Sequence, residues 1–315
     1  MNPRTQTAEP MGDTVLDLAP LAWLHDELQR ALQGALAAVR DYVTAHERSR
    51  SADLSAVDAA EMRLQAQALQ QAVGALEMVG LVPEARTVAA LQAVVERLIE
   101  RPLAAEPEVI PLVERGVWAL QDQLRRHLDR RGLPGLALFP FYRDWRQWVQ
   151  ARAHPADLWM QALPATLPVP KAQRILPSPR VRYWVERFAL PLLREGRVSA
   201  AVGLARLVAG LARAGGDPSQ TRFWSIAAAV FEAVAAQRLS TDVWFKRSVA
   251  SMLRLHVPSF SGGPTAGVPW EGSAREWLYL VARVDPAPDE TLPHAHALWK
   301  ALGWTEPLRW DPERR

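Results

Sequence analysis

The feature that most constrains this chain is the helical spacing of its apolar residues between positions 21 and 128. The first stripe begins directly after Pro20, a residue type favoured at helix starts. Its members recur every three or four positions: Leu21, Leu24, Leu28, Leu32, Leu36, Val39 and Val43. The alternation of apolar and polar residues that is typical of strands is absent from the sequence. The pattern therefore predicts an all-α protein.

Three further stripes with the same spacing follow the first. They predict helices from about Ser55, as the N-cap, to Val79, from Pro83 to Leu98, and from Val109 to Leu128. Helix-breaking stretches separate the four helices at Ser49–Asp53, Gly80 and Pro102–Pro107, and Gly132 closes the last one. Four amphipathic helices with short connections predict an antiparallel four-helix bundle.

The rest of the chain divides into three segments that differ in composition and in the spacing of apolar residues. Residues 1–18 are polar and aperiodic and are expected to form a disordered tail before the bundle of residues 19–132. Residues 133–179 are rich in proline and predict a connection with one short helix at about Tyr142–Ala151. Helical spacing returns in residues 180–315, which predict a second all-α domain. We expect the two halves to fold independently, with protease cleavage concentrated in the connection.

Composition excludes several classes of protein. The chain has no cysteine, so disulfides, thiolate metal sites and cysteine nucleophiles are ruled out. A net charge of +3 over 315 residues is too small to predict nucleic-acid binding. The first twenty residues lack the apolar core of a signal peptide, and no apolar run is long enough to insert into a membrane. We therefore expect a cytoplasmic protein that neither inserts into membranes nor binds nucleic acid.

Motifs of catalysis and of cofactor binding are also missing. The sequence contains no glycine-rich phosphate loop, no GxSxG and no HExxH. His294 and His296 are two residues apart, so on a helix they point to different faces and make a poor metal pair. The sequence thus predicts a protein that is not an enzyme and that holds no cofactor and no metal.

The second predicted helix carries the most informative motif. A histidine phosphotransfer domain places its acceptor His on a bundle helix, with Lys three residues later, Gly four residues later and a helix-ending Gly ten residues later. Gly74 and Gly80 have this spacing, which puts Gln70 at the acceptor position and Val73 at the lysine position. An amide nitrogen has its lone pair delocalised and cannot attack phosphorus. Gly74, at mid-helix, suits either the close approach of a partner or tight packing inside the bundle.

Several segments, in order along the chain, resemble one family. They are LAWLHDEL (21–28), QAVGALEMVGL (71–81), VERLIERP (95–102), LFPFYRDW (138–145) and HPADLW (154–159). The family comprises the N-terminal region of the CheA-like hybrid kinases of type IV pilus twitching, called PilL or ChpA, together with the scaffold protein FimL. The resemblance extends to the second predicted domain, and it is compatible with both the stand-alone and the kinase-attached members.

Kinase members of this family read LHQ where this sequence has Leu69, Gln70 and Gln71. The resemblance to FimL, which is degenerate at the same position, implies a scaffold that binds response-regulator-like or polar hub proteins of the pilus system and lies at the cell pole. The alternative is the phosphorelay part of a CheA-like kinase, or phosphorylation of a histidine outside the motif, such as His25 or His127. Gln70 favours the scaffold.

Overall fold

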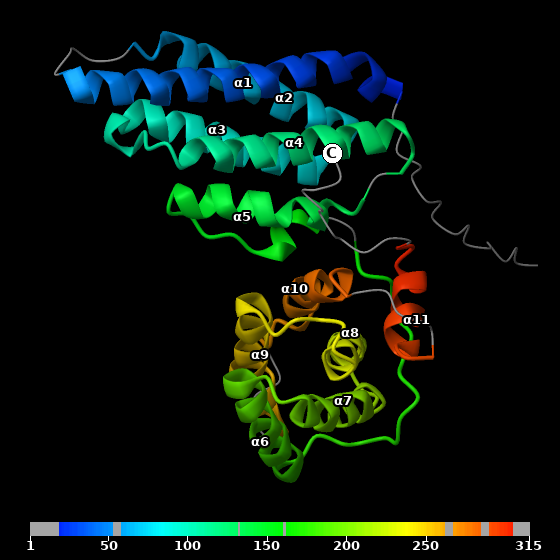
Figure 1. Cartoon of the computed structure of the whole chain (residues 1–315). Coiled ribbons are helices and arrows are strands. Elements are labelled where there is room, and N and C mark those ends of the chain that lie inside the picture. Colours follow the sequence, from blue (N-terminus) through cyan, green and yellow to red (C-terminus); the bar gives the residue numbers. More distant parts are fainter. Residues whose placement is uncertain are drawn as a thin grey trace, which may run out of the picture. The chain divides into compact units, whose positions relative to one another are not determined.

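The computed structural model describes residues 19–52, 58–131, 133–159, 162–261, 267–284 and 290–304. These residues form eleven α-helices and four short 3₁₀ helices, with no strand among them. The all-α prediction is confirmed. The chain divides into two compact units, Met1–Gly132 and Leu133–Arg315, and each is described by itself below (Figure 1).

The first unit is a four-helix bundle of α1 (Ala19–Ala52), α2 (Ala60–Val79), α3 (Val82–Glu100) and α4 (Val109–Leu128), with the 3₁₀ turn η1 (Pro102–Ala104) before α4. Helix α2 packs against α1 and α3, and α4 packs against α1 and α3. Figure 1 shows the four helices lying side by side. Their apolar stripes meet inside, although Leu24 of the predicted α1 stripe is only half-buried. The buried members of the α1 and α3 stripes are Leu21, Leu28, Leu32, Leu36, Val39, Val43, Val88, Leu91, Val95 and Leu98.

Three details of the bundle differ from the sequence prediction. Helix α1 continues to Ala52, through most of the expected break. Helix α2 begins at Ala60, and Asp58 accepts the Ala60 N–H at 2.9 Å, whereas the predicted N-cap Ser55 lies outside the described residues. Leu64, which we expected on the apolar stripe of α2 with Leu69, Val73 and Leu76, is 57% exposed. It precedes Leu69 by five residues, so at 100° per residue it lies about 140° around the helix from Leu69 and outside the buried stripe.

The second unit contains α5 (Phe139–Trp148), α6 (Pro179–Glu195), α7 (Val198–Ala212), α8 (Pro218–Ala235), α9 (Val243–Leu255), α10 (Trp270–Ala282) and α11 (Pro293–Ala301). It also contains the 3₁₀ turns η2 (Gly135–Leu138), η3 (Pro155–Leu158) and η4 (Val257–Ser261). Helix α8 is central, since it packs against α7, α10 and α11. Every residue from Phe223 to Phe231 is buried, as expected for a helix that is apolar around its whole circumference.

The proline-rich segment 133–179 packs as part of the second unit instead of forming a free connection. Phe139, at the start of α5, is fully buried and lies edge-on to Trp244 of α9 and Tyr279 of α10, with ring centroids 5.1 and 4.8 Å apart. Farther along, the Ile175 N–H donates to the Gly210 carbonyl at 3.0 Å, and Arg174 Nε donates to the Ala214 carbonyl at 3.0 Å. Prolines remove donors but leave carbonyls and side chains free to make such contacts.

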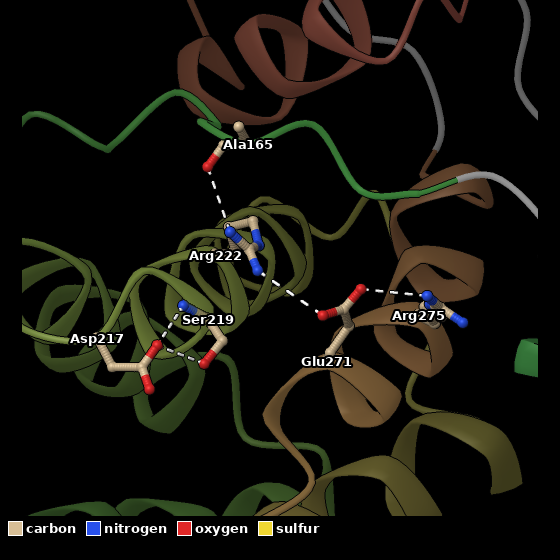
Figure 2. Close-up of polar contacts among 6 residues, drawn as sticks. All are labelled: Ala165, Asp217, Ser219, Arg222, Glu271 and Arg275. Carbon is tan, nitrogen blue, oxygen red and sulfur yellow. Dashed lines mark hydrogen bonds and ion pairs between the residues drawn. The ribbon is translucent and has the colours of Figure 1, made fainter.

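One arginine of α8 joins this segment to the helices of the unit (Figure 2). Arg222 donates to the carbonyl oxygen of Ala165 at 3.2 Å and lies 3.8 Å from Glu271 of α10. Glu271 in turn pairs with Arg275, one turn along the same helix, at 3.1 Å. Three separate stretches of the second unit are therefore held by one guanidinium. Nearby, Asp217 caps α8 by accepting the Ser219 N–H at 2.7 Å.

Candidate docking face on helix α2

The residue at the predicted acceptor position, Gln70, is exposed on α2. Its neighbour Leu69 is fully buried, and Val73 is half-buried. This difference follows from the helical period: Leu69, Ala72, Leu76 and Val79 form the stripe that faces the bundle, and Gln70 lies outside it. The side chain at the predicted acceptor position is thus accessible, but the lone pair of an amide nitrogen is delocalised into the carbonyl and cannot attack a phosphoryl group.

The two glycines of the motif serve different purposes. Gly80 has φ of 85° and ends α2 in the left-handed conformation; its N–H bonds the Glu77 carbonyl at 3.0 Å, and the Leu81 N–H bonds the Leu76 carbonyl at 2.9 Å. This is a Schellman cap, with Leu76 and Leu81 both buried beside it. Gly74 has no such role, because a Cβ added there would meet nothing within 4 Å. Tight packing in the bundle therefore does not explain Gly74.

Gly74 lies within an accessible surface that we call the α2 face, formed by Gln70, Gln71, Gly74, Glu77 and Met78. At 100° per residue these five positions cover about a third of the helix circumference. Met78 is 83% exposed, among the highest values for a large apolar side chain in the described residues. The face combines amides, one carboxylate and a flexible thioether around a residue without a side chain. Such a surface can bind another protein, but it contains no imidazole that could accept a phosphoryl group as a phosphotransfer histidine does.

Two histidines of the bundle, His127 and His25, contact neighbouring polar side chains. His127 Nε2 lies 2.8 Å from Oε1 of Glu84, a carboxyl that is 2% exposed. His25, near the start of α1, lies 3.3 Å from the amide of Gln29 and 3.5 Å from the carboxyl of Asp26. These contacts give both rings a structural partner on the same or a neighbouring helix.

A serine, a histidine and a glutamate come together in the second unit, which the sequence did not predict. Ser225 Oγ donates to the Pro168 carbonyl, and His294 Nε2 lies 2.9 Å from the Ser225 carbonyl oxygen. Glu232 accepts the backbone N–H groups of His294 and Ala295, at 3.3 and 2.8 Å. The Nε2 atom of His294 must carry a proton to donate to a carbonyl oxygen, so it cannot accept the proton of the Ser225 hydroxyl. The Glu232 carboxylate does not reach the His294 ring.

This trio therefore holds α11 and residue 168 against α8 and is not a catalytic triad. Burial lowers the pKa of His294 and raises the pKa of Glu232, because desolvation disfavours the charged form of each group. Elsewhere in the described ranges, no three His, Asp or Glu side chains lie close enough to hold a metal ion. No helix in those ranges is long and apolar enough to cross a membrane.

The fold defines an all-α protein of two helical units, with an accessible helix face around Gly74 in the first. Residues 170–315 match the family model of the FimL scaffold protein second domain. Over those residues the chain is similar to the second domain of the FimL scaffold, and the predicted relationship to FimL is confirmed there. Neither a curated protein nor a solved structure matches the chain.

Proposed function

We propose that this protein is a non-catalytic signalling scaffold of the type IV pilus chemosensory system, which controls twitching motility. The observation that carries the proposal is the match of residues 170–315 to the second domain of the FimL scaffold. The role of the first unit follows from Gln70 at the acceptor position and from the open α2 face around Gly74. Its partners would be response-regulator-like or polar hub proteins, bound in the cytoplasm at the cell pole.

The alternative is that the first unit takes part in a phosphorelay, as the N-terminal part of a CheA-like hybrid kinase. A phosphorylation assay separates the two. Incubated with a CheA-type kinase and labelled ATP, or with a phosphorylated response regulator, the full chain should retain no acid-labile phosphate. His25→Ala and His127→Ala should give the same blank result. Acid-labile label that disappears in either variant would contradict the scaffold and identify the acceptor.

The docking role of the α2 face has its own test. Gln70→Arg and Gly74→Leu add bulk to an accessible surface outside the core. Gln70→Arg should leave thermal stability nearly unchanged, and Gly74→Leu should raise it slightly, because Leu is the better helix former. Each should weaken binding of the response-regulator or hub partner by roughly tenfold, the loss of one good contact. Arg115→Gln is the matched control: it changes the charge by one unit at an exposed position on α4.

The readouts are pull-down affinity and twitching of a strain that carries each variant. Loss of binding in the two α2 variants, with the control intact, supports the proposal. Full binding and full twitching by stable Gln70→Arg and Gly74→Leu proteins would show that the face is unused.

A further inference from the structure

An open groove in the second unit contains a concentration of arginines that the scaffold proposal does not use. It has a volume of about 1130 Å³ and lies between α5, α9, α10 and the stretch from Ala151 to Pro155. Four arginines line it: Arg143, Arg152, Arg247 and Arg254. Small-molecule pockets typically measure roughly 300–1000 Å³, so this groove has the size to hold a polypeptide segment.

The acidic residues of the groove are already paired. Asp242 caps α9 by accepting the Phe245 N–H at 2.9 Å and pairs with Arg283 at 2.7 Å. Glu276 lies 3.4 Å from Nδ1 of His154. Arg143 pairs with Asp144. The charges inside the groove therefore do not neutralise the remaining arginines.

Three arginines are left with exposed guanidinium groups. Within the described ranges, Arg152, Arg247 and Arg254 have no carboxylate partner. The guanidinium of Arg247 lies over the ring of Trp244, 5.2 Å from its centroid, and that of Arg143 lies 5.9 Å from the same ring. Stacking on an aromatic ring orients a guanidinium while leaving its N–H donors available for an anion.

The arginines of α9 lie in one row. Arg247, Ser251 and Arg254 are spaced by four and three residues, so they share a face of the helix, and all three line the groove. Seven residues at about 1.5 Å each separate Arg247 from Arg254 by about 10 Å along the helix. One compact phosphate cannot span that distance. The N-terminus of α9, where a phosphate could otherwise bind, is taken by the Asp242 side chain.

We propose that this groove binds an acidic, partly apolar segment of a partner protein. Two carboxylates about 10 Å apart would pair with Arg247 and Arg254, which matches acidic residues two turns apart on a helix. Between them, apolar side chains would contact Trp244 and Leu255. Arg152, which also lines the groove, adds a third positive charge. The site lies in the second unit and does not depend on the α2 face or on the pilus assignment.

The test uses the full chain and a labelled synthetic helical peptide with Glu at positions i, i+7 and a Leu between them. Fluorescence anisotropy should show binding that weakens as salt rises. Arg247→Gln and Arg254→Gln should each weaken it by about fivefold, at the upper end for an exposed ion pair. The two losses should multiply in the double variant, because the sites are two turns apart. Arg206→Gln, an exposed arginine on α7 outside the groove, is the matched control.

Two comparisons make the test decisive. A peptide with Gln in place of both Glu residues should lose binding. A peptide with one Glu changed to Lys should bind the Arg254→Glu variant more tightly than it binds the unsubstituted protein. The same assay should be run with a single-stranded oligonucleotide and with a vesicle rich in anionic lipid. If either binds more tightly than the peptide and depends equally on Arg247 and Arg254, the assignment to a protein partner is overturned. Equal loss in Arg206→Gln would overturn the groove itself.

Discussion

The imidazole Nε2 of His127 on α4 lies 2.8 Å from Oε1 of Glu84 in the first turn of α3, where the carboxyl is almost entirely out of solvent. The amide of Gln123 donates to the same oxygen at 3.2 Å. This polar cluster joins two helices of the bundle at residues 43 positions apart. A buried carboxylate needs such donors, because an unpaired charge is costly to bury.

His127→Ala should therefore destabilise the first unit by about 2–3 kcal/mol, because it leaves Glu84 with a single donor. His127→Gln, which can still donate, should cost less. A double-mutant cycle with Glu84→Gln should give a coupling energy of at least about 1 kcal/mol. Hydrogen exchange of the α3 and α4 amides measures the stability of the bundle by itself, so the unfolding of the second unit does not enter the result. Unchanged protection in His127→Ala would mean that the contact contributes nothing.

Two glycines should respond to alanine in opposite directions. Gly74→Ala should stabilise the bundle by about 0.5–1 kcal/mol, because the position is helical and the added methyl meets nothing. Gly210→Ala should destabilise the second unit by about 1–3 kcal/mol, because its Cβ would lie 2.5 Å from the Ile175 side chain and 2.9 Å from the Gln173 carbonyl. Hydrogen exchange of α2 and α7 distinguishes the two effects. Stabilisation by Gly210→Ala would show that residues 173–175 do not pack on α7.

His256 should make the second unit sensitive to acid. It is 1% exposed among Phe223, Trp224 and Trp270, and both ring nitrogens are buried without a hydrogen-bond partner. Burial lowers its pKa from the usual 6.5 to about 4. Between these values the unfolded chain binds the proton and the folded chain does not, so stability is complete above pH 6.5 and declines as the pH falls toward 4.

The variant His256→Phe has no imidazole to protonate, so it lacks this loss of stability in acid. Its stability relative to the original chain should rise by up to roughly 3 kcal/mol between pH 7 and pH 4. Denaturant unfolding of both proteins at a series of pH values measures the difference, in which the other titrating groups cancel. A constant difference across that range would contradict the low pKa.

The segment before α6 should be required for the second unit to fold. A chain that begins at Leu133 retains Phe139 in the core and the bonds from residues 165 to 175 onto α7 and α8, whereas one that begins at Pro179 loses them. We expect the first to melt cooperatively and the second to aggregate or melt broadly. Limited proteolysis should accordingly leave residues 162–177 protected. If a protease cuts rapidly within residues 162–177 and leaves a stable fragment from residue 179, the segment is a free connection, as its proline content predicts.

The sequence by itself determined the helical class and the stripes that fill the bundle, and it predicts that Gln70 stands where a phosphotransfer domain has its acceptor. These properties are local: period 3.6 selects one face of each helix, and the covalent structure of a side chain fixes whether it contains an imidazole. Only the tertiary structure decided that the space above Gly74 is open and that Glu84 meets His127. It also placed Arg143 beside Trp244, and residues 133–179 in the second unit. Such contacts join residues far apart in the chain, and a proline-rich stretch has no periodicity from which its packing could be predicted.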